Sequence, residues 1–229
     1  MPGTLPRGFF AGSSLEVAPR LLGCVLEHET GEGLVAVMLT EVEAYDGAAD
    51  PASHAYRGRT ARNAVMFGAP GHAYVYFTYG MHFCVNLVCR PAGTASAVLL
   101  RAGRVIEGIP LAAARRAAAR NGAGRGASGP GAPGVVSPAV ERELARGPAR
   151  LCQALGIGRG QDGADACAPG SPLRIRPVPE TGSGQPVPDV SHGPRVGISA
   201  AADRPWRFWL TGDPTVSAYR PHTPRARPK

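Results

Sequence analysis

The alternation of apolar and polar residues along the chain predicts short strands interspersed with helices. Period-two alternation with β-branched and aromatic residues is typical of strands, and it occurs at 34–45, 73–79, 81–89, 95–101, 194–199 and 206–211. Apolar residues at helical spacing predict helices over 13–28, 107–120 and 138–156. The strands at 73–79 and 81–89 meet at Gly80, so we expect a hairpin there, and residues 47–72 have the composition of a loop.

Chain length and the placement of glycine predict one domain with flexible parts. A length of 229 residues suits a single domain, and 44% of the residues are apolar. We expect an N-terminal extension at 1–12, a domain at 13–220 and a disordered basic tail at 221–229. Within the domain, the Gly-rich tract 121–134 predicts a flexible loop. No run of about 18 apolar residues occurs, so we expect no membrane span and a cytoplasmic protein.

The charged residues point to a polyanionic partner. Lys and Arg number 25 against 17 Asp and Glu, which gives a net charge of +8. This balance favours nucleic acid as a partner, although an inert basic surface would have the same composition. The only lysine is Lys229, which almost excludes mechanisms that need a catalytic lysine. The five cysteines show no C-x-x-C spacing, so we expect buried, reduced thiols and no metal site.

The first motif with candidate chemistry is TEVEAY at 40–45. On a strand, the side chains of Glu41, Glu43 and Tyr45 point to one face. Charged residues on such a strand often face solvent, which is one interpretation of the motif. If the face lines a cleft instead, one of the carboxylates can act as a general base, and periodicity does not choose between Glu41 and Glu43.

Tyrosines gather in the second motif, AYVYFTYGMHFCVN at 73–86. Tyr74 and Tyr76 share one face of the first strand, whereas Tyr79 has the opposite parity and precedes Gly80. Tyrosines on strands mostly pack in the core. A tyrosine at the tip of a hairpin is instead open to stacking on bases or wedging into a duplex.

The third motif, SHAYRGRTARNAVMF at 53–67, is rich in arginine. The guanidinium groups of arginine and the neutral donors of threonine and asparagine suit phosphate oxygens. The alternative interpretation is a solvated loop without a partner. The candidate phosphate contacts are Arg57, Arg59, Thr60 and Arg62. His54, taken alone, is more often a satisfied histidine than a catalytic one.

Together and in this order, the motifs resemble the alkyladenine DNA glycosylases, also called methylpurine or 3-methyladenine DNA glycosylases. The resemblance runs from about Ser13 to Tyr219. It is carried by TEVEAY, SHAYRGRTARN, MFGAPGHAYVYFTYGMHFCVN, AVLLRA, GPARLCQALGI, RVGIS and GDPTVS. It implies a mixed α+β fold: a single domain with a curved, mostly antiparallel sheet, flanking helices and a protruding β-hairpin.

The resemblance also implies an activity. Members of this family flip an alkylated or deaminated purine out of double-stranded DNA and hydrolyse its N-glycosidic bond in base excision repair. We therefore expect 3-methyladenine and 7-methylguanine as substrates, with hypoxanthine and ethenoadenine left open, and no cofactor. Because no lysine is available to attack the sugar, we expect a monofunctional enzyme without lyase activity. The same resemblance suggests a monomer that associates with the nucleoid through DNA.

Three residues of these motifs resemble the family's catalytic groups. Glu43 resembles the general base that activates the attacking water. Arg101 in AVLLRA and the backbone carbonyl of Val196 in RVGIS resemble the other groups that hold this water.

Other positions resemble the groups that receive the base and open the duplex. The implied base pocket consists of Tyr45, His54, Tyr76 and Asn86. In it the two tyrosines stack on the purine, the histidine hydrogen-bonds near it, and the asparagine disfavours guanine. Tyr79 resembles the wedge that fills the vacated stack, with Met81 beside it. Position 82 departs from the family pattern, because His82 stands where other members carry tyrosine.

Three alternatives stay open from the sequence. A damaged-DNA-binding protein without catalysis would share the basic surface and the wedge, but it would not need Glu43 together with Arg101. A helix-hairpin-helix glycosylase is suggested by LGIGRG at 155–160, but it lacks the expected lysine, and we interpret this segment as the Gly-rich end of a helix. An RNA-acting enzyme of the same fold is the third alternative.

Overall fold

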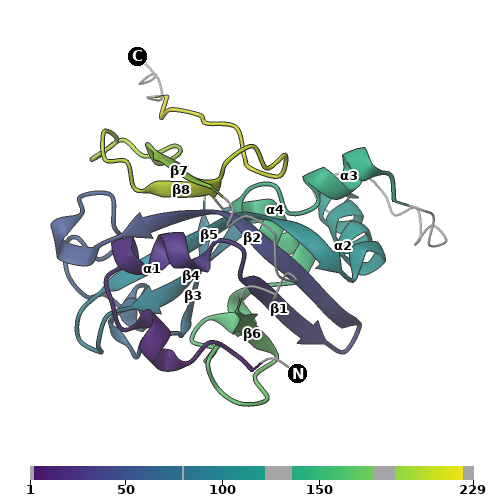
Figure 1. Ribbon diagram of the computed structural model, residues 1–229. Coiled ribbons are helices and arrows are strands. Elements are labelled where there is room, and N and C mark those ends of the chain that lie inside the picture. Colours follow the sequence, from purple (N-terminus) through teal and green to yellow (C-terminus); the bar gives the residue numbers. More distant parts are fainter. Residues whose placement is uncertain (1–2, 79, 122–135, 178–188, 224–229) are drawn as a thin grey trace.

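Strand β2 (Gly33–Tyr45) runs through the middle of a curled antiparallel sheet. The computed structural model describes residues 3–78, 80–121, 136–177 and 189–223. In this part of the chain the strand order is β3-β4-β5-β2-β1-β6, while β8 pairs with the second half of β2 and β7 pairs with β8 (Figure 1). The remaining strands are β1 (Val25–Thr30), β3 (Ala73–Thr78), β4 (His82–Cys89), β5 (Ser96–Glu107), β6 (Leu173–Arg176), β7 (Val190–Gly193) and β8 (Arg207–Leu210).

Helices cover this sheet and complete one mixed α+β domain, which confirms the predicted fold class (Figure 1). The α-helices of the described residues are α1 (Ser14–Leu21), α2 (Ile109–Asn121), α3 (Pro138–Glu143) and α4 (Pro148–Leu155). The 3₁₀-helices there are η1 (Arg7–Phe10), η2 (Gly47–Ala49), η3 (Ala64–Phe67) and η4 (Arg159–Gln161). A capping box between Ser13 and Glu16 starts α1. Gly156, at φ 69°, ends α4, which confirms the interpretation of that segment as a helix end.

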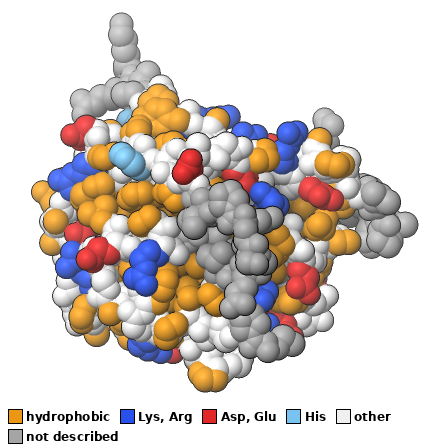
Figure 2. Space-filling view, in the orientation of Figure 1, with side chains coloured by type: hydrophobic (Ala, Val, Ile, Leu, Met, Phe, Trp, Pro, Cys, Tyr) orange, Lys and Arg blue, Asp and Glu red, His pale blue; other side chains and the backbone are white. Residues whose placement is uncertain are grey.

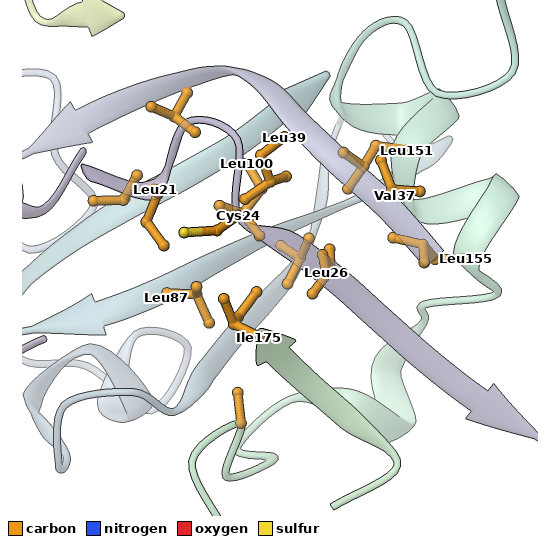
Figure 3. Close-up of a cluster of buried hydrophobic side chains, with 14 of the residues drawn as sticks. Leu21, Cys24, Leu26, Val37, Leu39, Leu87, Leu100, Leu151, Leu155 and Ile175 are labelled. Atoms are coloured by element: carbon orange, nitrogen blue, oxygen red, sulfur yellow. The ribbon is translucent and has the colours of Figure 1, made fainter. Parts of the chain in front are cut away.

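Successive residues of the central strands divide between a core face and a polar face. The core face carries Val75, Val85, Leu87, Val98 and Leu100. Figure 3 shows Leu100 among side chains of β1, β2 and α1, with Leu151 and Leu155 of α4 beside Val37 of β2. The segment before Ser13 also belongs to this core, since Phe10 is fully buried and the Leu5 N–H donates to the Ile175 carbonyl at 2.7 Å.

The helix predicted over 13–28 is wrong in its second half. The helix ends at Leu21, Gly23 takes a φ of 81°, and Val25–Thr30 forms strand β1. This segment pairs with β2 on one side and with β6 on the other. The backbone hydrogen bonds of two neighbours therefore override the helical spacing of its apolar residues.

The helix predicted over 138–156 is two helices, α3 and α4. Gly147, at φ 111°, interrupts it. The residues just before this glycine approach the sheet, where the Gly103 N–H donates to the Ala145 carbonyl at 3.2 Å. A continuous helix would lose this contact with β5.

The strand predicted at 194–199 is also wrong. Strand β7 ends at Gly193, and the residues that follow form a loop with Gly197 at φ 71°. Strand β6 was not predicted, because four residues carry too little periodicity. The hairpin, the strand near 206–211 and the helix near 107–120 are confirmed as β3–β4, β8 and α2, while β5 extends beyond the predicted 95–101.

Some expectations concern residues outside this description. They are the glycine-rich tract from residue 122 on, the basic tail from residue 224 on, and Tyr79. Among the described residues, none of the helices combines the length and apolar character needed to cross a bilayer.

Candidate functional site

A cavity of about 380 Å³ lies on the polar face of the sheet. Three cross-strand pairs of the β3–β4 hairpin line it: Tyr74 with Asn86, Tyr76 with Cys84, and Thr78 with His82. The sheet, the segments that precede β3 and β8, and the start of α4 contribute the rest: Tyr45, Ala52, His54, Met66, Leu99, Arg101, Pro148, Ala149, Val196, Gly197 and Ile198. The parity of the hairpin therefore decides which side chains reach the cavity.

Glu43 is fully buried and contacts residues that line the cavity. Its Oε1 accepts the Val196 N–H at 2.7 Å and lies 3.2 Å from Arg101 Nη1. Its Oε2 accepts the Tyr45 hydroxyl at 2.8 Å. Glu43 itself is not among the residues that line the cavity, but all three of these partners are.

Glu41 is also fully buried, so the interpretation that the TEVEAY carboxylates face solvent is wrong. Glu41 does not line the cavity. Its Oε1 accepts Nε–H groups of Arg101 and Arg207, each at 2.7 Å, and its Oε2 accepts the Ser217 N–H at 2.7 Å. Burial alone would raise the pKa of Glu41, but the two guanidinium groups outweigh burial and keep this pKa below its ordinary value.

Irregular pairing between β2 and β5 brings Arg101 to both carboxylates. Glu41 lies opposite Ala102 and Val42 lies opposite Leu100, so Arg101 is an extra residue without a partner across the ladder. Bulges of this kind redirect a side chain. Here the guanidinium reaches Glu41 with Nε and Glu43 with Nη1.

A buried ion pair packs against the ring of Tyr45. Arg195 and Asp50 are fully buried and bind each other through two hydrogen bonds, at 2.5 and 2.8 Å. The Arg195 guanidinium lies 4.6 Å from the centre of the Tyr45 ring and also stacks on Trp206. Burial and the neighbouring Glu43 raise the pKa of Tyr45, so its hydroxyl stays protonated and donates.

All four predicted base-pocket residues line this cavity: Tyr45, His54, Tyr76 and Asn86. The His54 and Tyr76 rings meet edge to face at 4.5 Å. Nδ1 of His54 lies 3.0 Å from the Tyr74 hydroxyl, and the Asn86 amide donates to the Tyr74 carbonyl at 3.0 Å. Burial and the charge of Arg62 lower the pKa of His54, so the imidazole is neutral near pH 7.

The arginine-rich segment is ordered by a buried asparagine. Asn63 donates to the carbonyls of His54 and Gly58 and accepts the Thr60 N–H at 2.7 Å. Residues 56–62 of the segment are exposed, including Arg57, Arg59, Thr60 and Arg62. In the described part of the chain no carboxylate pairs with these arginines, which leaves their donors available. Only Arg62 approaches the base pocket, 6.0 Å from the centre of the Tyr76 ring.

The remaining predicted contacts lie at the hairpin tip. Met81 is 65% exposed and lies outside the cavity lining. Tyr79 is outside the described residues. On the face in Figure 2, acidic and basic side chains are interspersed, so the excess of arginine is not gathered there.

Sequence reasoning missed several residues that complete the site. Tyr74 has the same strand parity as Tyr76, and Cys84 has the same parity as Asn86, so period-two alternation was sufficient to predict both in the cavity lining. Asp50, Arg195, Arg207 and Ser217 carry no local signal, because they meet the TEVEAY strand only through tertiary contacts. Among the described residues, no cluster of three or more His, Cys, Asp or Glu side chains could hold a metal ion.

Comparison with known proteins shows the family of this chain. The Methylpurine-DNA glycosylase (MPG) family matches residues 8–214, and the chain belongs to this family. A relative from Streptomyces avermitilis is 56% identical over 97% of this chain and 95% of its own length. Relatives from Leifsonia xyli and Frankia casuarinae are 53% and 46% identical, covering 94% and 96% of this chain and 92% and 95% of their own lengths. All three carry the name "Putative 3-methyladenine DNA glycosylase".

Proposed function

We propose that this protein is a monofunctional DNA glycosylase that removes alkylated or deaminated purines by hydrolysis. The observation that carries the proposal is the buried Glu43 carboxylate, whose two hydrogen-bond partners, Tyr45 and Val196, and ion-pair partner, Arg101, all line one cavity. Family membership and the names of the relatives support DNA repair and 3-methyladenine as the substrate. We extend the substrates to 7-methylguanine and, as neutral candidates, to hypoxanthine and ethenoadenine.

In the proposed reaction, a water molecule held near Glu43 attacks C1′ of the flipped nucleotide. The new bond joins the water oxygen to C1′, the bond from C1′ to N9 breaks, and its electron pair leaves with the purine. Glu43 takes the proton of the water. Oε2 of Glu43 has two lone pairs and the Tyr45 hydroxyl uses one, so the second can accept a water hydrogen. Arg101 and the Val196 carbonyl are the proposed further partners of this water.

The charge of the lesion decides how easily the purine leaves. A purine alkylated at N3 or N7 is cationic and departs as a neutral base. Such a cation between Tyr45 and Tyr76 gains about 0.5–2 kcal/mol from the ring faces. A neutral lesion lacks this gain and depends on hydrogen bonds, for which His54 is the proposed partner. Asn86 would disfavour guanine at its exocyclic amino group.

The proposed partner is double-stranded DNA, and the protein would act on it as a monomer in the cytoplasm, at the nucleoid. Flipping a nucleotide costs a few kcal/mol, part of which a side chain inserted into the vacated stack can offset. Tyr79 is the proposed wedge, with the exposed Met81 beside it. The exposed donors of the arginine-rich segment are the proposed phosphate contacts: Arg57, Arg59, Thr60 and Arg62. Replacing Tyr79 by serine should reduce flipping, reported by 2-aminopurine beside the lesion, and an unchanged signal would contradict this role.

Base release from defined duplexes tests the catalytic proposal. The duplexes carry one of the four lesions, and abasic sites are read as strand breaks after hot alkali. The Glu43→Gln variant should keep binding to lesion DNA while excision falls by about 10²–10⁴. Strand breaks without alkali would contradict the monofunctional assignment, which rests on Lys229 as the only lysine. Lesion binding without release by the wild type would instead favour a damage-binding protein.

Salt titration tests the DNA partner independently of catalysis. If about four to six phosphates are neutralised, the logarithm of the binding constant falls with the logarithm of salt concentration at a slope of about −4 to −5. Replacing Arg59 should weaken lesion-bearing and undamaged duplexes alike, because phosphate contacts position the protein without reading sequence. Binding that is independent of salt would refute a DNA partner.

A further inference from the structure

Glu41 is a buried carboxylate for which the proposed chemistry has no use. Neither Glu41 nor Glu43 is among the residues that line the cavity, but all three partners of Glu43 line it, whereas only Arg101 connects Glu41 to it. Glu41 nevertheless binds two guanidinium groups, those of Arg101 and Arg207, and receives the N–H and hydroxyl of Ser217. A fully satisfied buried carboxylate next to a proposed general base is a costly arrangement for stability alone.

Arg101 divides its guanidinium between the two glutamates. Nε lies 2.7 Å from Glu41, whereas Nη1 lies 3.2 Å from Glu43. Because a guanidinium is planar and rigid, the shorter bond at Nε sets the direction of Nη1. Glu41 therefore fixes where the Arg101 guanidinium lies.

The charges around Glu43 balance only with Glu41 present. Two guanidinium groups, Arg101 and Arg207, face two carboxylates on the same face of β2. The other titratable neighbours of Glu43 are Tyr45, Tyr76 and Cys84, and burial raises the pKa of each, so they stay neutral. Arg195 lies behind Tyr45 but is neutralised by Asp50.

We propose that Glu41 is a positioning residue. It fixes the position of Arg101 and neutralises part of the positive charge that Arg101 and Arg207 would otherwise exert on Glu43. Without Glu41, both positive charges would act on Glu43 alone, which would stabilise its ionised form and make it a weaker base. The pKa of Glu41 lies below its ordinary value, which agrees with this role. Glu41 therefore stays negatively charged at every pH at which an ionised Glu43 can act as a base. This inference rests on the proposed function and names a further residue for the same reaction.

The test is the pH dependence of base release by the Glu41→Gln variant. Duplex DNA methylated with dimethyl sulfate is the substrate, and free bases are measured by chromatography from about pH 4 to 8. We expect the acid limb of the single-turnover rate to move down by about one pH unit, since a charge within about 4–6 Å shifts a titration by one to three units. We also expect the rate on the plateau to fall about tenfold, as for a weakened base.

The chain offers a matched control in Glu27. This glutamate is also buried and also binds two arginines, Arg174 and Arg176, on strand β6. It lies outside the cavity lining and outside the network of Glu43. Glu27→Gln should therefore lower the melting temperature without moving the acid limb.

A second variant keeps the proposal falsifiable if Glu41→Gln does not fold. Arg207→Gln removes one positive charge, so the acid limb should move up, opposite to the effect of Glu41→Gln. An acid limb that stays at the wild-type pH in the folded variants would overturn the proposal and leave Glu41 a structural residue. Absence of base release by the wild type would refute the proposed function, and the role of Glu41 with it.

Discussion

Replacing Arg195 by methionine should destabilise the fold more than any exposed arginine replacement. Arg195 is fully buried, binds Asp50 through two hydrogen bonds and donates to the Ala44 carbonyl at 3.0 Å. In the Arg195→Met variant, the Asp50 carboxylate still accepts the Ala52 N–H at 3.1 Å, but the cation that neutralised its charge is gone. Removing one partner of a buried pair costs about 3–5 kcal/mol.

This cost translates into a measurable change in melting temperature. For a domain of this size, 1 kcal/mol corresponds to about 2–4 °C, so the melting temperature should fall by about 6–20 °C. Urea unfolding followed by circular dichroism gives the free energy directly. Adding Asp50→Asn should recover part of the loss, because the uncompensated charge is then removed.

Arg104→Met is the matched control. Arg104 pairs with Asp213 at 2.7 Å; the Arg104 side chain is 54% exposed, and the buried Asp213 carboxylate also accepts the N–H and hydroxyl of Thr215. Because water can reach the cation and Asp213 keeps two other donors, this variant should lose less stability than Arg195→Met. Equal losses for the two variants would refute the argument that burial makes the Arg195 pair essential.

Three further predictions concern stability. Gly103→Ala should lower the free energy of unfolding in urea by about 1–3 kcal/mol, because the new Cβ would lie 2.4 Å from the Met38 carbonyl oxygen. Gly31→Ala is the control: its Cβ would meet nothing within 4 Å, so its stability should not change. Burial lowers the pKa of His28 in the folded protein, so the unfolded chain binds a proton at this histidine more tightly. The free energy of unfolding should therefore fall as pH drops through about 6.5, and His28→Gln should make this fall less steep. Ser13→Ala removes the cap of α1 and should cost about 0.5–2 kcal/mol by thermal melting, and no change would contradict the capping box.

Local patterns in the sequence determined the hairpin and the orientation of its side chains. Period-two parity alone places Tyr74 and Tyr76 on one face of a strand, and likewise Glu41, Glu43 and Tyr45. Both sets lie on the polar face around the cavity. The motif order was sufficient to indicate the family to which the chain belongs.

Tertiary structure decided the features that depend on partners distant in sequence. Residues 25–30 became a strand because β2 and β6 lie on either side of them. Periodicity could not separate Glu41 from Glu43, since both have the same parity and are equally buried. Their environments differ because a bulge in β5 directs Arg101 between them, and Arg207 and Val196 arrive from more than 150 residues away. A carboxylate's chemistry depends on the charges that folding places around it, and local sequence does not encode those distances.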